Sequence, residues 1–428
     1  MTNIRILPRA LGPTAAAAFT GVVLIGALAA CDLNDALDVE AASRIPAETL
    51  EQPANAILLV NSAIGDFECA YGAYVVAGGL IGEELVDGAQ TADRYPFDRR
   101  STQPSDRRYA VSACDALGVY TPLQTARVSA ENVISLLSKW TDAEVPNRQQ
   151  LIATVSAHAG YSLLMLGEGF CEAVISNFDD AQNPVLGGII GRDSVLKLAE
   201  ARFTDALGST DASIKNMALL GRAKARQDLG RLADARGDAI QVPATFERNI
   251  TASATPSRRQ NKVWADGSVT ARGSLVGDPY RSMTDPRVKF TRTTTTTVTG
   301  IPVIYQTKYP EAASPIPFAT GDEAQFIVAE ADLAAGNTTS AVNIINTFRA
   351  RAGFGPFTGS GAAAIKAELV EQRRREFFLE GQHLGDLIRY GITPQPAAGT
   401  AYHGSGVYGN QLCLPLPDAE RINNPNAK

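Results

Sequence analysis

Cys31 is the residue whose surroundings point most directly to a chemical modification. It follows Leu28-Ala-Ala at the end of an apolar run over 15–30, and the charged residues before that run are both arginines. A basic start, a short apolar stretch and small residues before a cleavage point are typical of a secretory signal. Small residues directly before a cysteine also match the bacterial lipobox. We therefore expect cleavage before Cys31 and acylation of this cysteine, because several acyl chains anchor a protein stably. The alternative is a secreted protein in which Cys31 has no special role.

The remaining four cysteines are an even number, as expected for disulfide bonds in an oxidising compartment. They are Cys69, Cys114, Cys171 and Cys413. Three pairings are possible, and we prefer Cys69–Cys114 with Cys171–Cys413 because the first two lie in one N-terminal unit. The alternative is four buried free thiols. No two cysteines have CxxC spacing, which argues against a zinc ribbon or a thioredoxin-like dithiol.

No motif in the sequence indicates catalysis. GxSxG, HExxH and Walker A patterns are absent, and His158, His383 and His403 lack metal-ligand spacing. Residues 404–409 fit GxGxxG by letter, but they lack the preceding strand and following helix that a dinucleotide site requires. Glu83-Glu84 would diverge by about 100° on a helix, so a solvated helix end explains them better than an acid/base pair. We therefore expect a protein that is not an enzyme and needs no metal or cofactor.

Composition excludes several functional classes. The chain has 428 residues, 45% hydrophobic and 20% charged, as in ordinary globular proteins. Its net charge of −6 and pI near 5.3 argue against a nucleic-acid binder, whose footprint is normally basic. A mean hydropathy of −0.05 excludes a polytopic membrane protein. The apolar run over 15–30 is shorter than the roughly 20 residues of a spanning helix.

Helical periodicity dominates the chain after the leader, and it predicts a mainly all-α fold. The expected helical segments are 48–64, 123–140, 148–166, 194–207, 212–242 and 323–352. Gly167-Glu-Gly169 reads as a helix stop. The segments 212–242 and 323–352 each contain a central glycine turn, so each predicts two closely packed helices like a tetratricopeptide hairpin. Two such hairpins imply a curved stack of antiparallel helices.

Three segments depart from this pattern. Residues 251–317 include a threonine-rich run and Ile301-Pro-Val-Ile-Tyr305 around a Gly300 turn, which predicts a small β-rich insertion. Residues 86–108 and 393–409 are irregular and contain several glycines and prolines. We expect one domain over 31–428: a tether over 31–45, the insertion over 251–317 and a C-terminal helical part over 318–428, after a signal peptide over 1–30.

The segment Ile365–Tyr390 combines an apolar stripe with dense charge. Glu371 and Arg375 are four residues apart and can pair on a helix surface. A run of three arginines beside two phenylalanines indicates an ion network that holds this helix to its neighbours.

This segment also carries a family resemblance. Glu371-Gln-Arg-Arg-Arg-Glu-Phe-Phe-Leu-Glu-Gly-Gln-His-Leu-Gly-Asp-Leu-Ile-Arg389 resembles the signature helix of the SusD/RagB outer-membrane lipoproteins. Three further stretches are similar to that family in the expected order: 308–331, Asn343–Gly353 and Leu414–Pro425. The family usually has a large aromatic after its Gly-Gln-Arg, whereas this chain has Gly381-Gln-His-Leu-Gly, so local packing must differ. The early helices match only loosely.

The resemblance implies a function. Members are helical, lipid-anchored proteins at the outer membrane. They bind an oligosaccharide, or in some cases peptides, and deliver it to a SusC-type TonB-dependent transporter without catalysing a reaction. An acidic residue directly after the lipidated cysteine, here Asp32, retains lipoproteins at the inner membrane in some bacteria, and the rule differs between phyla.

The resemblance marks no ligand-binding residues by motif, so candidates come from the irregular segments. Sugars are held by an aromatic face and planar hydrogen-bonding side chains. The candidates are Tyr95, Phe97, Asp98 and Arg100 in one segment and Trp264, Asp266 and Tyr280 in another. The alternative is that these aromatics pin their own loops.

Two other functions stay open at this point. The first is an envelope scaffold that binds a peptide or protein segment through its helical hairpins. The second is a glycoside hydrolase, which needs two carboxylates about 5–9.5 Å apart in a cleft.

Overall fold

The computed structural model describes residues 47–110, 114, 117–179, 183–255, 258–269 and 273–428. The chain divides into two units, 1–50 and 51–428. In the first, the described part is the short helix α2 (Ala47–Leu50). The predicted signal peptide, Cys31 and the tether lie outside the described residues. All other described helices and strands belong to the second unit.

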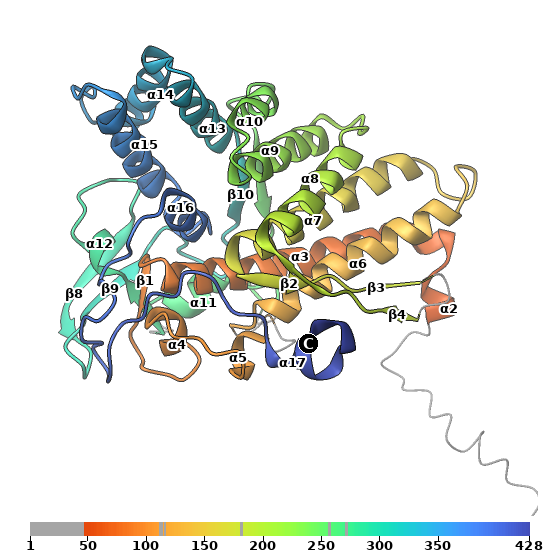
Figure 1. The fold of residues 1–428 in the computed structure, drawn as a ribbon, viewed down its shortest axis with the longest axis horizontal. Helices are drawn as coiled ribbons and strands as arrows, with labels where there is room; N and C mark the ends of the chain where they lie inside the picture. Colours follow the sequence, from red (N-terminus) through yellow and green to blue (C-terminus); the bar gives the residue numbers. More distant parts are fainter. Residues whose placement is uncertain (1–46, 111–113, 115–116, 180–182, 256–257, 270–272) are drawn as a thin grey trace, which may run out of the picture. The chain divides into compact units, whose positions relative to one another are not determined.

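Helices make up most of the second unit, which confirms the predicted all-α class (Figure 1). From α3 to α15, each long helix packs against the next long helix along the chain, while α16 packs against α3 and α7. The long helices are α3 (Ala56–Ile81), α6 (Tyr120–Lys139), α7 (Arg148–Gly169), α8 (Arg192–Ala206), α9 (Ala212–Asp228), α10 (Leu232–Ala239), α13 (Gly321–Ala334), α14 (Thr338–Arg351), α15 (Ala362–Glu376) and α16 (His383–Tyr390). Short helical turns are η1 (Pro53–Asn55), α4 (Tyr95–Asp98), α5 (Arg107–Ala110), α11 (Lys262–Gly267), α12 (Asp278–Arg281), α17 (Asp418–Asn423) and η2 (Pro425–Ala427).

The strands are short and form antiparallel pairs instead of a continuous sheet. The pairs are β1 (Leu85–Asp87) with β7 (Ser274–Val276), β2 (Glu172–Val174) with β5 (Ile189–Gly191), β3 (Asn177–Phe178) with β4 (Pro184–Val185), β6 (Glu247–Ile250) with β10 (Ile316–Thr320), and β8 (Phe290–Thr296) with β9 (Pro302–Gln306). The β8–β9 hairpin turns at Gly300, as predicted, with a φ of 81° that suits glycine.

The two predicted helical hairpins are present, and both turn at glycines. In α9–α10 the chain reverses at Gly230 (φ 74°), and in α13–α14 it reverses at Gly336 (φ 84°). Both glycines have the left-handed conformation that ends many helices. The hairpins pack against each other through α10 and α13, so the predicted stack of antiparallel helices is confirmed.

One helix runs further than predicted, and another ends at its predicted glycine stop. The helix expected over 48–64 is α3, which begins at Ala56 and continues to Ile81. The stop expected at 167–169 is confirmed, because α7 ends at Gly169. A Cβ at Gly169 would lie 2.6 Å from Tyr74 Cε2, and one at Gly167 would lie 2.8 Å from Leu196 Cδ2. These glycines also allow close contacts of α7 with α3 and α8.

The segment 365–390 is two helices and not one. It breaks between α15 and α16, where Leu379 and Gly381 have φ values of 56° and 77°. Glu84 Oε1 accepts a hydrogen bond from Leu379 N in the break (2.7 Å). The break sends α16 back toward α3 and α7, which it contacts.

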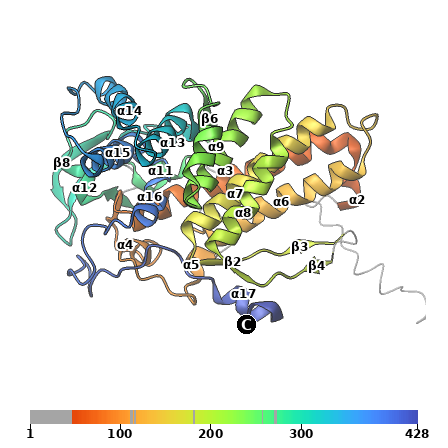
Figure 2. The ribbon, with the colours of Figure 1, turned by 45° about the horizontal axis from the view of Figure 1, so that its top comes forward.

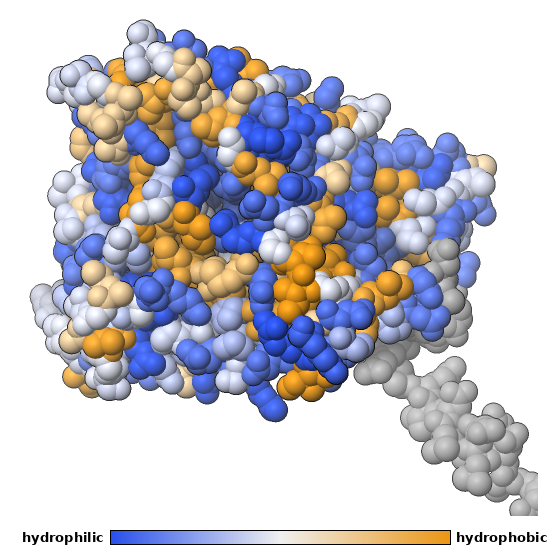
Figure 3. All heavy atoms as spheres, in the orientation of Figure 1, coloured by the Kyte–Doolittle hydropathy of each residue, from blue (hydrophilic) through white to orange (hydrophobic). Residues whose placement is uncertain are grey.

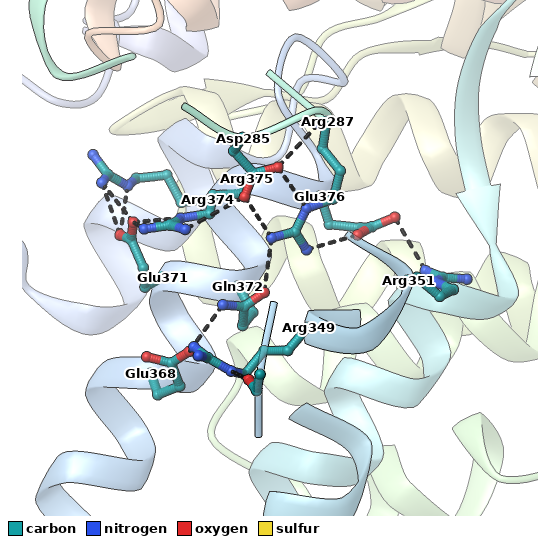
Figure 4. Close-up of polar contacts among 11 residues, drawn as sticks. Asp285, Arg287, Arg349, Arg351, Glu368, Glu371, Gln372, Arg374, Arg375 and Glu376 are labelled. Carbon is teal, nitrogen blue, oxygen red and sulfur yellow. Dashed lines mark hydrogen bonds and ion pairs between the residues drawn. The ribbon is translucent and has the colours of Figure 1, made fainter. Parts of the chain in front are cut away.

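The predicted ion network on this segment is confirmed. Glu371 pairs with Arg375 at 2.5 Å and with Arg374 at 2.8 Å on the surface of α15. Arg375 also reaches Asp285, and Arg287 links Asp285 to Glu376 (Figure 4). The network therefore joins α15 to the segment between α12 and β8.

The cysteines pair as Cys69–Cys114 and Cys171–Cys413 in the structure, the pairing that the sequence analysis preferred. The first bond joins α3 to the connection before α6. The second joins the end of α7 to the C-terminal segment, beside the bridge between Phe170 and Leu414.

No helix among the described residues is long and apolar enough to cross a bilayer. On the face in Figure 3, hydrophobic residues form patches separated by hydrophilic ones. Exposed large hydrophobic side chains include Phe178 and Val185 on the β3–β4 hairpin.

Candidate functional site

The three segments that lack helical periodicity meet at one end of the second unit. Figures 1 and 2 both show α4, α12 and the β8–β9 hairpin there. The β1–β7 pair joins the first segment to the second, with Leu85 opposite Val276. Gly409 N donates to the Arg99 carbonyl (2.8 Å), and this hydrogen bond joins the third segment, 393–409, to the first, 86–108. Backbone hydrogen bonds therefore hold together segments that are about 100 to 300 residues apart in sequence.

All three segments line one cavity of about 190 Å³, which we call the Arg100 pocket. Arg100 Nε donates to the Gly409 carbonyl (3.1 Å), and its guanidinium lies 4.8 Å from the centre of the Tyr408 ring. The lining residues are Glu83, Leu85, Val86, Asp98, Arg100, Gly277, Asp278, Arg281, Ile301, Gln395, Pro396, Ala401, His403 and Tyr408.

A second cavity of about 500 Å³, the Tyr95 cleft, lies between the first and third segments. Its lining residues are Gln90, Tyr95, Arg99, Tyr402, Gly404 and Ser405. This volume is in the range of ligand-binding clefts. The two cavities share a wall, because Tyr402 packs at 4.0 Å between ring centres against His403 of the pocket.

Backbone strain is concentrated around these cavities. Five described residues other than glycine have a left-handed φ, and three of them line the two cavities: Glu83 (66°), Gln90 (54°) and Arg100 (54°). Such residues cost free energy and cluster at functional sites, where the surrounding structure holds them. At Gln90 the holding group is Asp87, whose Oδ1 accepts from the backbone N of Gln90 (2.9 Å) and of Ala89 (3.0 Å).

Two carboxyl groups lie buried behind the cleft. Asp98 Oδ2 accepts from Asp87 N (2.9 Å) and from the Tyr402 hydroxyl (3.0 Å). Burial raises the pKa of Asp98 to about 7, and burial also raises the pKa of Asp87 to about 6. Burial lowers the pKa of His403, which accordingly favours the neutral ring.

The predicted ligand residues divide into two groups. Tyr95 lines the cleft, and Asp98 and Arg100 line the pocket. The other four candidates line neither cavity and have structural contacts instead. Phe97 is buried, Trp264 is packed against the core, Asp266 is ion-paired with Arg94, and Tyr280 is buried and stacked on Phe378 (5.0 Å). The contacts of these four residues agree with the structural alternative, in which the side chains hold their own segments in place.

Sequence reasoning missed several residues of the site. Gln90 and Arg99 flank predicted candidates but were not selected, and Tyr402, Ser405 and Tyr408 lie in the third irregular segment. The available signal was the polar and aromatic content of residues 393–409. Within that segment, residues 404–409 matched a dinucleotide-binding motif by letter only. Among the described residues, no group of three or more His, Cys, Asp or Glu side chains is placed to hold a metal ion.

Comparison with known proteins finds a family match in the C-terminal part of the chain. The sequence model of the SusD family matches residues 323–423, which include the hairpin α13–α14 and helices α15 and α16. No curated protein sequence matches the chain.

Solved structures share the fold over most of the chain. A SusD superfamily protein from Bacteroides vulgatus has a TM-score of 0.69 at 14% identity, covering 88% of this chain and 98% of its own. A SusD-like carbohydrate binding protein from the same organism has a TM-score of 0.65 at 14% identity, covering 88% and 97%. A laminarin binding SusD-like protein has a TM-score of 0.66 at 13% identity, covering 86% and 98%. The C-terminal part of the chain thus matches the SusD family model, and the chain shares its fold with SusD-like structures.

Proposed function

We propose that this protein binds an oligosaccharide in the Tyr95 cleft without transforming it. We also propose that an acylated Cys31 anchors it at the outer membrane, where it delivers the ligand to a SusC-type TonB-dependent transporter. The observation that carries the proposal is the convergence of two irregular segments, 86–108 and 393–409, on a strained, aromatic-lined cleft. Support comes from the fold shared with proteins described as carbohydrate binding and laminarin binding.

The cleft has the chemistry that sugars require. The Tyr95 ring is half-buried and can pack against the apolar face of a sugar ring. Gln90 and Ser405 add an amide and a hydroxyl for hydrogen bonds to sugar hydroxyls. Tyr402 offers its ring, because its hydroxyl already donates to Asp98.

The same geometry favours binding over hydrolysis. A glycosidase needs two carboxyl groups facing the scissile bond, and no carboxylate lines the Tyr95 cleft in the described part of the chain. Asp98 lies behind Tyr402, and Glu83 contacts His383 (3.6 Å) and the backbone N of Gln395.

Calorimetric titration with a panel of oligosaccharides tests the binding site. We expect at least one saturable ligand, and we expect Tyr95→Ala to weaken its binding about tenfold or more because the stacking face is lost. Phe178→Ala is the matched control, since it removes an exposed aromatic from β3, away from the cleft. Equal weakening by both variants, or turnover of the ligand, would contradict the proposal. Binding of peptides alone would favour the scaffold alternative.

Anchoring and delivery need a separate test in cells. Mass spectrometry of the native protein should show a mature chain that begins with acylated Cys31, and mild detergent extraction should recover it with a large β-barrel protein. Cys31→Ala should release the protein from the membrane fraction. An unmodified Cys31, or a quantitatively extracted protein with no barrel partner, would overturn this part of the proposal.

A further inference from the structure

The charge of Arg99 is the feature of the Tyr95 cleft that a neutral sugar does not explain. Arg99 follows α4 directly and is half-buried in the cleft wall. Its Nε donates to Ser101 Oγ (2.9 Å), and its Nη1 donates to the Ser405 carbonyl (3.4 Å). Both acceptors are neutral, so these contacts position the guanidinium without balancing its charge.

Three nearby arginines are paired with carboxylates, whereas Arg100 donates to the backbone carbonyls of Gly409 and Pro396 in the Arg100 pocket. Arg94 is paired with Asp266 (2.7 Å from Nε), Arg108 with Asp93 (2.7 Å) and Arg281 with Asp278 (2.8 Å). In the described part of the chain, Arg99 has no carboxylate within ion-pair distance, although its surroundings are rich in such pairs. An unpaired guanidinium beside a ligand cavity is a recognition group for carboxylate or sulfate, which it can bind with two parallel hydrogen bonds.

The rest of the cleft is compatible with an anion. Its other lining residues are two tyrosines, a glutamine, a serine and a glycine, none of which carries negative charge. The guanidinium carbon lies over the Tyr95 ring, 5.5 Å from its centre, so a ligand that contacts Tyr95 in the cleft also lies near the Arg99 charge. The nearest buried carboxyl, Asp98, lies behind Tyr402 and has a pKa of about 7, so it carries little negative charge below that pH.

We propose that the cleft selects anionic oligosaccharides, in which Tyr95 stacks on a sugar ring and Arg99 binds a carboxylate or sulfate group of that sugar. This inference rests on the proposed function, because it names the ligand class of the same site. A uronate and a sulfate ester each carry one negative charge and can each present two oxygens to a guanidinium, so the experiment has to distinguish them.

The test compares three ligands of equal length on the full mature protein. They are an oligogalacturonate, the same oligomer with its carboxylates methyl-esterified, and a sulfated neutral oligosaccharide. We expect at least one anionic oligomer to bind about tenfold tighter than the esterified one, with an affinity that falls as salt rises. The stronger of the two anionic ligands then identifies the natural substituent.

Arg99→Gln should remove this preference, so that the anionic oligomer binds no more tightly than the esterified one. Arg107→Gln is the charge-matched control, because Arg107 is exposed on α5 and does not line the cleft. Arg99→Lys should retain part of the preference, since the charge remains but the bidentate geometry is lost. Far-ultraviolet circular dichroism would show that the variants are folded.

The outcomes separate this inference from the proposed function. If neutral and anionic oligomers bind equally and Tyr95→Ala weakens both, the anionic preference is wrong and the glycan site stands. If no oligosaccharide of any charge binds, both are wrong. If an acidic peptide binds and the anionic oligosaccharides do not, the cleft recognises an anion on another kind of ligand, and the inference is overturned.

Discussion

At the scale of single residues, the site depends on groups that burial holds in unusual states. Asp98 is the clearest case, since it is 4% exposed and accepts two hydrogen bonds. It anchors Tyr402 and the backbone of β1 at once. The carboxyl thus connects the first and third irregular segments, and its protonation affects both cavities.

This arrangement predicts a pH dependence of stability. The pKa of Asp98 is about 7 in the folded protein and about 3.9 in an unfolded chain. The folded state therefore binds more protons between these values, and the free energy of unfolding falls as pH rises through the window. We expect Asp98→Asn to flatten the decrease between pH 5 and 8, measured by urea unfolding. Asp87 and Glu380, with pKa values of about 6 and about 7, leave a residual slope. Identical slopes in the variant and the parent would contradict the role of Asp98.

At the scale of elements, close contact decides where helices run. Glycines inside α7 pack against Tyr74 and Leu196, so their missing side chains allow neighbouring residues to approach. A glycine in α10, Gly237, has open space around its Cα instead. The same residue type thus has opposite roles in two helices.

The two glycines should respond oppositely to alanine. Gly169→Ala places a Cβ 2.6 Å from Tyr74 Cε2, and we expect it to destabilise the protein by about 1–3 kcal/mol through overpacking. Gly237→Ala should stabilise it by about 0.5–1 kcal/mol, because alanine is the better helix former. Chemical denaturation of both variants measures the difference. Destabilisation by Gly237→Ala would contradict the expectation that a Cβ with no neighbour within 4 Å is tolerated at this position.

Helix α15 separates buried from exposed charge. Arg373 is 1% exposed and binds Asp386 with two hydrogen bonds of 2.9 and 3.0 Å. Burial alone would raise the pKa of Asp386, but Arg373 and Arg389 lower it to about 2. This pair therefore stabilises the fold above about pH 4, and its contribution is lost as pH falls toward 2. The surface pairs of Glu371 (Figure 4) lie in water-accessible surroundings.

Substitutions on the two faces of α15 should differ in cost. Arg373→Met leaves a buried carboxylate with one fewer partner, and we expect a loss of about 3–5 kcal/mol. Glu371→Gln should cost less than about 1 kcal/mol, because its ion pairs are screened by solvent. Thermal and urea unfolding of both variants provide the comparison. A similar loss in both would mean that the surface network matters more than its exposure implies.

At the scale of the whole molecule, covalent and hydrogen-bond links hold the C-terminal part of the second unit to its earlier elements. The Cys171–Cys413 bond joins two residues that are 242 positions apart in the sequence. The residues after Cys413 contact Tyr109 of α5 and Glu172 of β2. The third irregular segment lies just before Cys413, so this bond limits its freedom.

Removal of this bond should weaken both stability and binding. We expect the double variant Cys171→Ala/Cys413→Ala to lose about 2–5 kcal/mol of stability, because the unfolded chain gains loop entropy. Ligand binding should weaken as well, since Tyr402 and Ser405 precede Cys413 by only a few residues. Calorimetry with the ligand found above measures both effects. Unchanged binding at a lower melting temperature would show that backbone contacts alone order the cleft.

Local pattern in the sequence was enough for the helical class, the two glycine-turn hairpins and the Glu371–Arg375 pair. Apolar periodicity and turn glycines act over a few residues, so they are readable without knowledge of neighbours. The likeness to the SusD/RagB family followed from short motifs in a set order, and the family match lies over the same C-terminal region. The three irregular segments were also recognisable as departures from helical periodicity.

Only the tertiary structure decided which side chains of those segments form a site. Tyr95 and Tyr280 are both tyrosines on four-residue helices, yet one lines the cleft and the other stacks in the core. Gly167 and Gly230 each follow a stretch with helical periodicity, yet Gly167 lies inside α7 and Gly230 lies in the turn after α9. The physical reason is that each outcome depends on a partner from a distant part of the chain, Tyr402 for the Tyr95 cleft and Leu196 for Gly167. The packing of the whole helical stack decides which of these partners come into contact.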